Sequence, residues 1–415
     1  MQTSIGKLRL AVFMAGLAAT ASAMTWSNIK GYPVPTSESY PFWITTGSDG
    51  ALWFTEYAGD KIGRITTDGL IAEYPLPTSG SGPYGITAGP DGALWFTEYN
   101  GNNIGRITTA GAVSEYPVPT VNSGANLITA GPDGALWFTE YTANKIGRIT
   151  IAGVFTEYLV PTAGAGPAGI ATGPDGALWF TEYSSNKIGR ITTAGVVTAE
   201  YPVPTPQNSE PLGITAGPDG ALWFSEYVGK IGRITTGGVF TEYPIPTAGS
   251  QPYGITAGPD GAVWFAEYYS NNIGRITTAG VISEYHLPSV GGGPYGITAG
   301  PDGELWFTEY AGNNIARAPA CGLGLSASFA NGMLTMNFNL GIDIPATWFA
   351  NLHTSTGGEK QLWSKSISAV VPPASFTLTS TAGFPDVGTV TIGSGLETPA
   401  GGGLCYEAVN VDTAQ

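Results

Sequence analysis

The chain has 415 residues, of which only 11% are charged, and its formal net charge is −15 with a pI near 4.4. This acidic balance argues against a nucleic-acid-binding protein, because phosphates need a cationic surface, and against binding to an anionic membrane. The length also exceeds one ordinary compact core, so a repeat architecture or several domains are expected.

The first 23 residues are typical of an export signal. Lys7 and Arg9 form a positive start, a short apolar stretch follows, and Ala-Ser-Ala at 21–23 is a small-residue cleavage site. The apolar stretch is too short to stay as a membrane span. We therefore expect a mature protein that begins near Met24, is secreted or periplasmic, and has no membrane span.

A phrase related to Leu-Trp-Phe-Thr-Glu then recurs seven times, with its tryptophans 42, 42, 42, 44, 41 and 42 residues apart. These tryptophans are Trp53, Trp95, Trp137, Trp179, Trp223, Trp264 and Trp306. A period in the low forties with strand-like patterning is typical of a β-propeller blade. The repeat predicts an all-β fold with a seven-bladed β-propeller over residues 24–320.

One unit, residues 83–120, shows the expected blade. Its four predicted strands cover residues 85–88, 93–99, 104–108 and 113–118, and a Gly-Pro-Asp-Gly turn separates the first two. The prolines at 117 and 119 cannot donate to a ladder, so the fourth strand must be an edge strand.

The outer-strand phrase, a variant of Tyr-Pro-x-Pro-Thr, predicts how the ring closes. Its first copy, at Tyr32, precedes the first tryptophan, and no copy follows the last one, so the unit of Trp306 has only three strands. We expect residues 31–36 to supply the fourth strand of the last blade and to remove the open edges.

The tail, residues 321–415, loses the repeat but keeps alternating apolar and polar segments, which predict a small all-β module resembling a sandwich. In an oxidising compartment Cys321 and Cys405 would form one disulfide, which contributes about 4 kcal/mol if it acts by restricting the unfolded chain. Two free buried thiols are the alternative. The role of the module stays open, with adhesion or spacing as guesses.

Three charged positions recur in every unit. The turn aspartate, Asp91 in the unit above, is fully explained by its turn. The strand glutamates are Glu56, Glu98, Glu140, Glu182, Glu226, Glu267 and Glu309, and the strand arginines are Arg64, Arg106, Arg148, Arg190, Arg233, Arg275 and Arg317. One acid and one base on adjacent strands of each blade predict a structural ring of ion pairs.

The residue after the blade-opening proline varies between units and should lie at the mouth of the central channel. It is Phe42, Tyr84, Asn126, Ala168, Leu212, Tyr253 and Tyr295 in chain order. Four aromatic residues are consecutive once the ring closes, and such an arc either stacks on a sugar or aromatic ligand or merely plugs the mouth. The candidate ligand-binding residues are Phe42, Tyr84, Asn126, Tyr253 and Tyr295.

Ordinary catalytic groups are sparse. The two histidines are His286, in a predicted outer strand, and His353, in the tail. Glu210, just before Pro211, is one extra acid at a blade entrance.

The stretch Pro-Tyr-Gly-Ile-Thr-Ala-Gly-Pro-Asp-Gly-Ala-Leu-Trp-Phe-Thr-Glu-Tyr at 83–99, with its repeats, resembles the streptogramin B lyase (virginiamycin B lyase) family over about residues 31–317. The resemblance implies a seven-bladed propeller that opens a cyclic depsipeptide by elimination at its ester. It also implies a histidine that takes the α-proton and a magnesium ion that polarises the lactone.

Chain position carries the two histidine slots of the family to Tyr253 and Tyr295, and its two glutamate slots to Gly293 and Glu309. Only Glu309 matches, and tyrosine, with an ordinary pKa of about 10, is a poor general base. Glu309, Tyr253 and Tyr295 are therefore the candidates for catalysis, and Glu309 is the candidate magnesium ligand.

Three functions remain open at this point. The first is an exported, monomeric propeller that binds a small molecule, glycan or peptide without histidine catalysis. The second is a magnesium-dependent carbon–oxygen lyase that linearises streptogramin B type depsipeptides with a different base. The third is a structural or adhesive surface protein.

Overall fold

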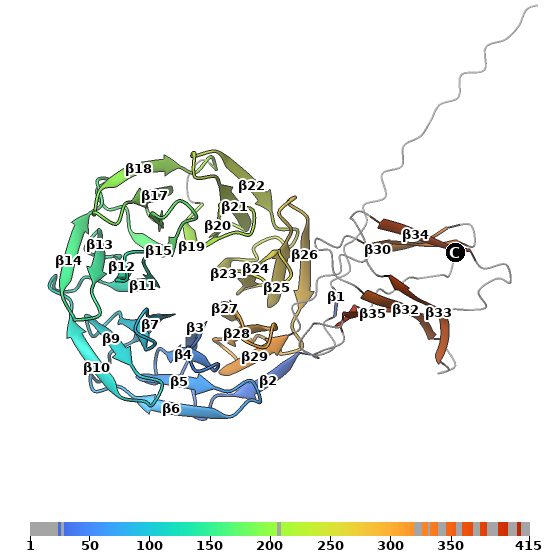
Figure 1. Cartoon of the computed structure of the whole chain (residues 1–415), viewed down its shortest axis with the longest axis horizontal. Helices are drawn as coiled ribbons and strands as arrows, with labels where there is room; N and C mark the ends of the chain where they lie inside the picture. The colour runs from blue at the N-terminus through green and yellow to red at the C-terminus, as the bar shows by residue number, and fades with distance from the viewer. Residues whose placement is uncertain are drawn as a thin grey trace, which may run out of the picture.

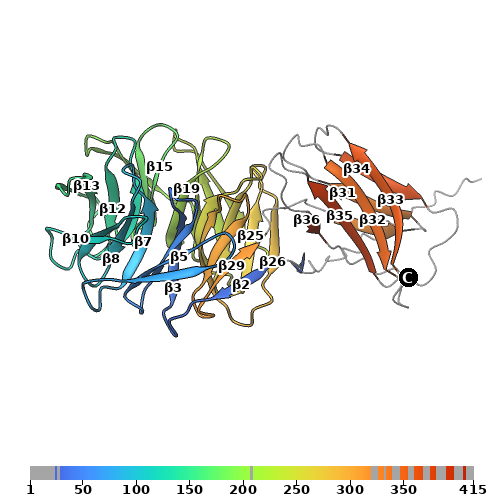
Figure 2. The same ribbon diagram turned by 60° about the horizontal axis from the view of Figure 1, so that its bottom comes forward.

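The structure is a computed structural model that describes residues 29–205 and 209–318 in full. Elsewhere it describes only the backbone of β1 (Met24–Thr25) and of the strands after residue 318. Every element in these ranges is a β-strand. Seven sheets surround a central axis (Figure 1), and Figure 2 shows neighbouring blades standing side by side around it. The chain therefore forms the seven-bladed β-propeller that the repeat predicts.

The two inner strands of each blade carry the conserved phrases of the repeat. The innermost strands are β3 (Pro41–Thr46), β7 (Pro83–Ala88), β11 (Ala125–Ala130), β15 (Pro167–Thr172), β19 (Pro211–Ala216), β23 (Pro252–Ala257) and β27 (Pro294–Ala299). The second strands are β4 (Leu52–Glu56), β8 (Leu94–Glu98), β12 (Leu136–Glu140), β16 (Leu178–Glu182), β20 (Leu222–Glu226), β24 (Val263–Glu267) and β28 (Leu305–Glu309). Every residue of the second strands is buried, because blades pack against both faces of each sheet.

The two outer strands complete each sheet. The third strands are β5 (Lys61–Ile65), β9 (Asn103–Ile107), β13 (Lys145–Ile149), β17 (Lys187–Ile191), β21 (Lys230–Ile234), β25 (Asn272–Ile276) and β29 (Asn314–Ala318). The outermost strands are β6 (Ile71–Pro75), β10 (Val113–Pro117), β14 (Phe155–Leu159), β18 (Val197–Pro202), β22 (Phe240–Pro244), β26 (Ile282–His286) and β2 (Lys30–Pro33). β1 adds a short parallel pairing outside β26.

The last blade is closed by the first outer-strand phrase. β2 pairs antiparallel with β29, so the last sheet has the order β2-β29-β28-β27. Beyond the strands, Asn313 Nδ2 donates to the carbonyl of Thr36 at 2.9 Å, and Asn313 Oδ1 accepts from the amide of Ser39 at 2.9 Å. The position of the Tyr-Pro-x-Pro-Thr phrases predicts this closure, and the pairing confirms it.

A β-bulge at the start of each innermost strand positions the variable residue. In β7 the register against β8 shifts between Pro83 and Ile86, which frees the residue after the proline from the ladder. The carbonyl of Tyr84 instead accepts a hydrogen bond from Thr55 Oγ1 of the preceding blade at 2.8 Å. The same hydroxyl accepts from the amide of Trp43 at 3.0 Å. In six of the seven blades a threonine or serine hydroxyl at this position therefore joins neighbouring blades at the axis, while the other blade has Ala266 there.

Each turn aspartate joins a tryptophan and an arginine. Trp95 Nε1 donates to Asp91 Oδ1 at 3.0 Å, Arg106 Nε donates to Asp91 Oδ2 at 2.7 Å, and the guanidinium lies 5.9 Å from the indole centroid. Burial acts to raise the pKa of Asp91, but the hydrogen bonds from Trp95 and Arg106 hold it below its ordinary value. The predicted glutamate–arginine pairing was wrong, because the register places Arg106 opposite Trp95, three pair positions from Glu98.

Six of the seven strand glutamates are instead buried beside a second acid, and the exception is Glu309, because Gly31 stands at the matching position of β2. Glu140 is fully buried, and neither of its carboxyl oxygens has a hydrogen-bond partner. Burial, followed by the charge of Glu157, raises the pKa of Glu140 to about 8. Glu157 stays ionised, since it accepts from Lys145 Nζ at 2.8 Å and from Thr120 Oγ1 at 2.7 Å. One carboxylic acid and one carboxylate therefore stand side by side, and Thr120 ties this pair to the preceding blade.

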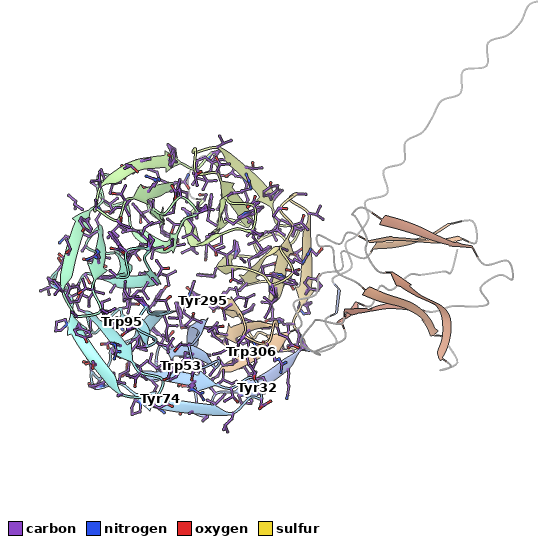
Figure 3. All side chains as sticks on the ribbon, in the orientation of Figure 1. Tyr32, Trp53, Tyr74, Trp95, Tyr295 and Trp306 are labelled. Carbon is purple, nitrogen blue, oxygen red and sulfur yellow. The ribbon has the colours of Figure 1, made fainter. Side chains whose placement is uncertain are left out.

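Outer-strand tyrosines cover the tryptophans. Tyr74 stacks on Trp53 with ring centroids 5.6 Å apart, and Tyr32 stacks on Trp306 at 5.7 Å (Figure 3). The tryptophans are fully buried and pack against the next blade, as in the cluster that joins Trp53 to Phe96. Each wall between blades therefore has the same apolar filling, which leaves the mouth of the channel free to vary.

After residue 318 the structure gives backbone strands only. They are β30 (Ser326–Ala330), β31 (Met333–Phe338), β32 (Ala346–His353), β33 (Glu359–Ile367), β34 (Ala374–Thr379), β35 (Thr389–Leu396) and β36 (Cys405–Glu407). They pair as two antiparallel sheets, β30-β31-β34 and β33-β32-β35-β36. The export signal, the Cys321–Cys405 disulfide and the His353 side chain lie outside the described residues. Among those residues, no helix has the length and apolarity to cross a bilayer.

Candidate functional site

Two sets of seven side chains meet where the innermost strands begin. The first set is the variable residue after each blade-opening proline. The second is the tyrosine that follows each strand glutamate: Tyr57, Tyr99, Tyr141, Tyr183, Tyr227, Tyr268 and Tyr310. The bulge aims the first set, and the end of each second strand places the second set beside it. The mouth of the channel is therefore rich in phenol groups.

The aromatic residues of the variable set pack against one another. The ring of Phe42 lies 4.1 Å from that of Tyr84 and 4.0 Å from that of Tyr295, centroid to centroid. Tyr295 in turn lies 4.3 Å from Tyr253. Phe42 is only 7% exposed and Tyr295 only 8% exposed. The four rings form a continuous arc that fills one side of the mouth, and we call these residues the aromatic arc.

A cavity of about 380 Å³ lies beside the aromatic arc, over the small and aliphatic members of the variable set. Asn126, Ala168 and Leu212 line it, together with the backbone of Gly169 and Gly213. A side chain at Gly169 would be blocked, because its Cβ would lie 2.1 Å from the carbonyl oxygen of Leu212. The cavity exists because this side of the ring carries little side-chain volume.

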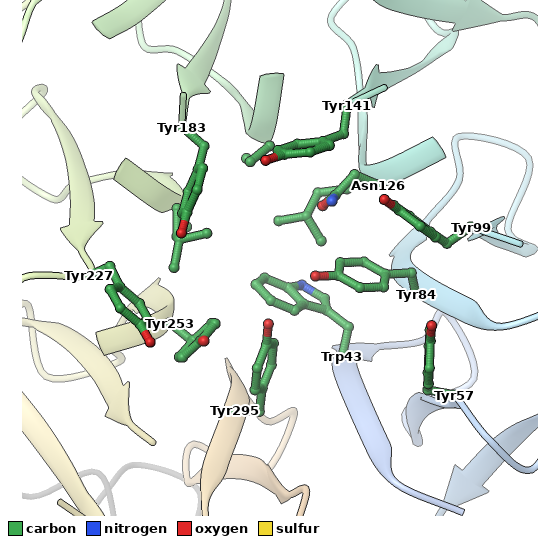
Figure 4. A pocket seen from close by; sticks show the side chains of 15 residues that line it. Trp43, Tyr57, Tyr84, Tyr99, Asn126, Tyr141, Tyr183, Tyr227, Tyr253 and Tyr295 are labelled. Carbon is green, nitrogen blue, oxygen red and sulfur yellow. The ribbon is translucent and has the colours of Figure 1, made fainter. Parts of the chain in front are cut away.

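Aromatic side chains, together with Leu127, form the remaining walls of this cavity. Figure 4 shows the indole of Trp43 and the phenols of Tyr84 and Tyr295 reaching toward its middle. Of the candidate ligand-binding residues, Tyr84, Asn126, Tyr253 and Tyr295 are on its lining, whereas Phe42 is held inside the aromatic arc.

Sequence reasoning missed six further aromatic residues of the lining. They are Trp43, Tyr99, Tyr141, Tyr183 and Tyr227, and Tyr57 on the same lining is the sixth. Reasoning from variation alone passed over the tyrosines, since they are identical in every blade. The antiparallel pairing of the two inner strands was the available signal. It places the tyrosine just past each buried glutamate at the same end of the sheet as the variable residue.

Three phenols of this site, those of Tyr84, Tyr253 and Tyr295, have a pKa above that of an ordinary tyrosine. Burial raises the pKa of Tyr84 to about 12. Burial, followed by neighbouring phenols, raises the pKa of Tyr253 and of Tyr295 above the ordinary value. At neutral pH these side chains therefore keep their protons. They can donate hydrogen bonds and offer ring faces, but they are poorly suited to abstract a proton.

The matched glutamate lies away from this cavity. Glu309 is 2% exposed, accepts from Ser289 Oγ at one oxygen and from Asn314 Nδ2 at 3.1 Å at the other, and is not on the lining. Gly293 offers no side chain, and its φ is +59°. A magnesium ion needs several oxygen ligands at short range in octahedral geometry. One carboxylate already bonded to a hydroxyl and an amide does not fit that requirement.

The remaining metal and base candidates are also distant from the axis. His286 ends the outermost strand β26, is exposed, and has its Nδ1 3.0 Å from Asn272 Oδ1. Within residues 29–205 and 209–318, no three of the His, Cys, Asp and Glu side chains cluster as a metal site would require. The described site therefore offers phenols, one amide and apolar surface.

Comparison with known proteins fits this geometry. The family model described as the virginiamycin B lyase family matches residues 16–227 and 198–323. The chain belongs to the virginiamycin B lyase family. A streptogramin B lyase structure has 42% identity and a TM-score of 0.67, covering 70% of this chain and 96% of that one. The virginiamycin B lyase from Staphylococcus aureus has 43% identity and a TM-score of 0.67, covering 70% of this chain and 98% of that one.

A third solved structure bears on the histidine slots. It is a catalytically inactive variant of the Staphylococcus aureus enzyme, with histidine replaced by alanine, bound to quinupristin. It has 42% identity to this chain, a TM-score of 0.67, and coverage of 70% of this chain and 98% of that chain. In the present family member, the cavity lining contains no histidine. The scaffold of the family is thus kept, while the aromatic arc occupies the slots that the resemblance gives to histidines.

Proposed function

We propose that this propeller binds a small molecule, or the end of a glycan or peptide, in its axial cavity without histidine-based elimination. The observation that carries the proposal is a tyrosine-lined cavity of about 380 Å³ at the end of the channel where the innermost strands begin. Its size and its mixture of ring faces with a few polar groups suit one planar ring or a short chain end.

The same geometry supports a lyase function less well than a binding function. A base must reach the proton and have a pKa near the working pH, whereas the phenols of Tyr253 and Tyr295 hold their protons. Tyr295 is also packed between Phe42 and Tyr253. Glu309 remains outside the cavity. We infer that binding, rather than proton abstraction, is what this mouth performs.

The activity test uses quinupristin and magnesium, with the Staphylococcus aureus virginiamycin B lyase as a positive control. Ring opening by elimination leaves the mass unchanged, so the linear product is followed by its chromatographic shift and its fragment pattern. We expect linear product with the control enzyme and none with this chain. Linear product formed by this chain would overturn the non-catalytic part of the proposal.

The binding test uses 2-phenylethanol, a neutral aromatic alcohol, followed by ligand-observed NMR. Ala168→Trp should abolish binding, because Ala168 is 4% exposed and lines the cavity. Val121→Trp is the matched control, since Val121 is 78% exposed and its bulk would face solvent. Binding that survives Ala168→Trp, or is absent from the unchanged protein, would contradict a binding role for the cavity.

We also propose that the protein acts after export, on the basis of the leader-like residues 1–23. The tail would then serve as an attachment or partner module. Mass spectrometry of the protein recovered from the producing cells tests the first point: a mature chain that starts near Met24 supports export, and an intact leader contradicts it.

A further inference from the structure

In each blade, the residue two positions before the variable residue has a left-handed backbone conformation. Together these seven residues surround the mouth. The residues and their φ angles are Tyr40 (52°), Gly82 (56°), Gly124 (65°), Gly166 (61°), Glu210 (50°), Gln251 (49°) and Gly293 (59°). Glycine reaches this region without a steric penalty, whereas side chains with a Cβ rarely do. Three blades nevertheless carry a residue with a Cβ there, namely Tyr40, Glu210 and Gln251, and the last two are in adjacent blades. Strain of this kind is concentrated at functional sites.

Glu210 is bonded directly to the wall of the cavity. Its Oε2 accepts a hydrogen bond from the hydroxyl of Tyr183 at 2.8 Å, and its backbone carbonyl accepts from the amide of Tyr227 at 3.2 Å. Both tyrosines line the cavity. Burial, followed by the hydrogen bond to Glu210, raises the pKa of Tyr183. The carboxylate is therefore held at the rim by a phenol that keeps its proton.

No positive charge of the described chain neutralises this carboxylate. The fifteen residues of the lining include no charged side chain, and within residues 29–205 and 209–318 Glu210 forms no ion pair. The lysines on the third strands of the two blades that flank Glu210 are engaged elsewhere: Lys187 donates to Thr162 Oγ1 at 2.6 Å, and Lys230 donates to Thr205 Oγ1 at 2.6 Å. The cavity thus has one uncompensated negative group at its rim and phenol faces inside.

We infer that the axial cavity selects an organic cation, with the ammonium or guanidinium group of the ligand at Glu210 and its apolar part against the phenols. The inference rests on the proposed binding function and adds the charge of the ligand. Tyrosine faces attract cations through their quadrupole, and a carboxylate adds a charge-assisted hydrogen bond. A net charge of −15 favours approach of the same kind of ligand.

Neutral and anionic ligands fit the same cavity less well. An anion would meet Glu210 without any cation to offset the repulsion. A neutral ligand would gain the ring contacts but would leave the Glu210 charge without a cationic partner. Tyr183 supplies one hydrogen bond to that carboxylate, while an ionised carboxylate accepts several. The remaining acceptor positions are what a protonated amine would use.

The test compares two probes of equal size, phenethylamine, which is protonated at pH 7, and 2-phenylethanol, which is neutral. Affinities are measured by calorimetry on the full chain, for the unchanged protein, for Glu210→Gln and for Glu38→Gln. Glu38 is an exposed acid in the loop before the first blade that also has a positive φ, so its replacement removes the same charge elsewhere.

We expect the unchanged protein and Glu38→Gln to bind phenethylamine about tenfold more tightly than 2-phenylethanol, a ratio typical of one charge-assisted contact with ring support. Glu210→Gln should bring the two affinities within about twofold while keeping the affinity for 2-phenylethanol. Equal affinities in the unchanged protein, or a preference that survives Glu210→Gln, overturn the inference and leave cavity binding intact. Binding of neither probe overturns both.

Discussion

The buried strand glutamates predict an unusual pH dependence of stability, and Glu140→Gln isolates it. Glu140 is fully buried, its oxygens are unpartnered, and its pKa is raised from 4.5 to about 8. Between these two values the unfolded chain has lost this proton while the folded chain still holds it. Stability must therefore fall as the pH rises through this window, because folding then requires a proton to be taken up.

The size of the effect follows from the width of that window. Each pH unit corresponds to about 1.4 kcal/mol per group, so the change from pH 5 to pH 8 is at most about 3.5 kcal/mol for Glu140. Glutamine carries no proton equilibrium and nearly the same shape. Relative to the unchanged protein, Glu140→Gln should therefore gain up to about 3.5 kcal/mol between pH 5 and pH 8.

The assay is urea unfolding followed by tryptophan fluorescence at both pH values. Glu157→Gln provides a control whose effect on stability should change with pH in the opposite direction. Burial acts to raise the pKa of Glu157, but the hydrogen bonds from Lys145 and Thr120 hold it below its ordinary value. Its contribution is present above its unfolded pKa and is lost as the pH falls, so Glu157→Gln should cost more at pH 8 than near pH 4. If Glu140→Gln has the same effect at pH 5 and pH 8, Glu140 is ionised in the folded protein and the reasoning fails.

Two further predictions concern the repeated wall and the closure. Asp133→Asn should destabilise the protein by about 1–3 kcal/mol, as expected for a partly buried ion pair, because Asp133 accepts from Trp137 Nε1 at 3.0 Å and from Arg148 Nε at 2.7 Å. The urea midpoint measures the loss, and an unchanged midpoint would contradict it. Tyr32→Ala should cost about 3–5 kcal/mol, since Tyr32 is 8% exposed and stacks on Trp306 across the closing sheet. Faster hydrogen exchange confined to β2 and β29 would locate that loss at the closure, whereas uniform exchange would argue against it.

The fold was accessible from the sequence because its period is long, regular and complete. Seven tryptophans fixed the number of blades, and the offset of the Tyr32 phrase relative to Trp306 fixed the closing strand. The partner of each arginine was predicted wrongly, because adjacency of strands was considered without register. Counting along the hairpin pairs Glu98 with Asn103 and leaves Arg106 opposite Trp95, about 10 Å away from the acid along the strand.

The site was less accessible, for a physical reason. The cavity depends on the small side-chain volume at Ala168 and Leu212 and on the packing of Phe42 within the aromatic arc. Neither feature follows from a local sequence pattern. Glu210 looked like an isolated acid in the sequence. Its importance comes from a left-handed backbone and a hydrogen bond to Tyr183 in the preceding blade, which only the assembled ring brings together.

The aromatic arc and the cavity beside it have one common cause. Tryptophan–aspartate–arginine sets recur in all seven blades and buried acid pairs in six, so the walls between blades are built from similar groups. At the axis, by contrast, side-chain volume is concentrated on one side, in the aromatic arc. The aromatic arc fills the slots that the family resemblance gives to histidines, and the same asymmetry opens the cavity opposite, beside Glu210. The aromatic arc and the cavity beside Glu210 are therefore two results of one uneven distribution of side-chain volume around the axis.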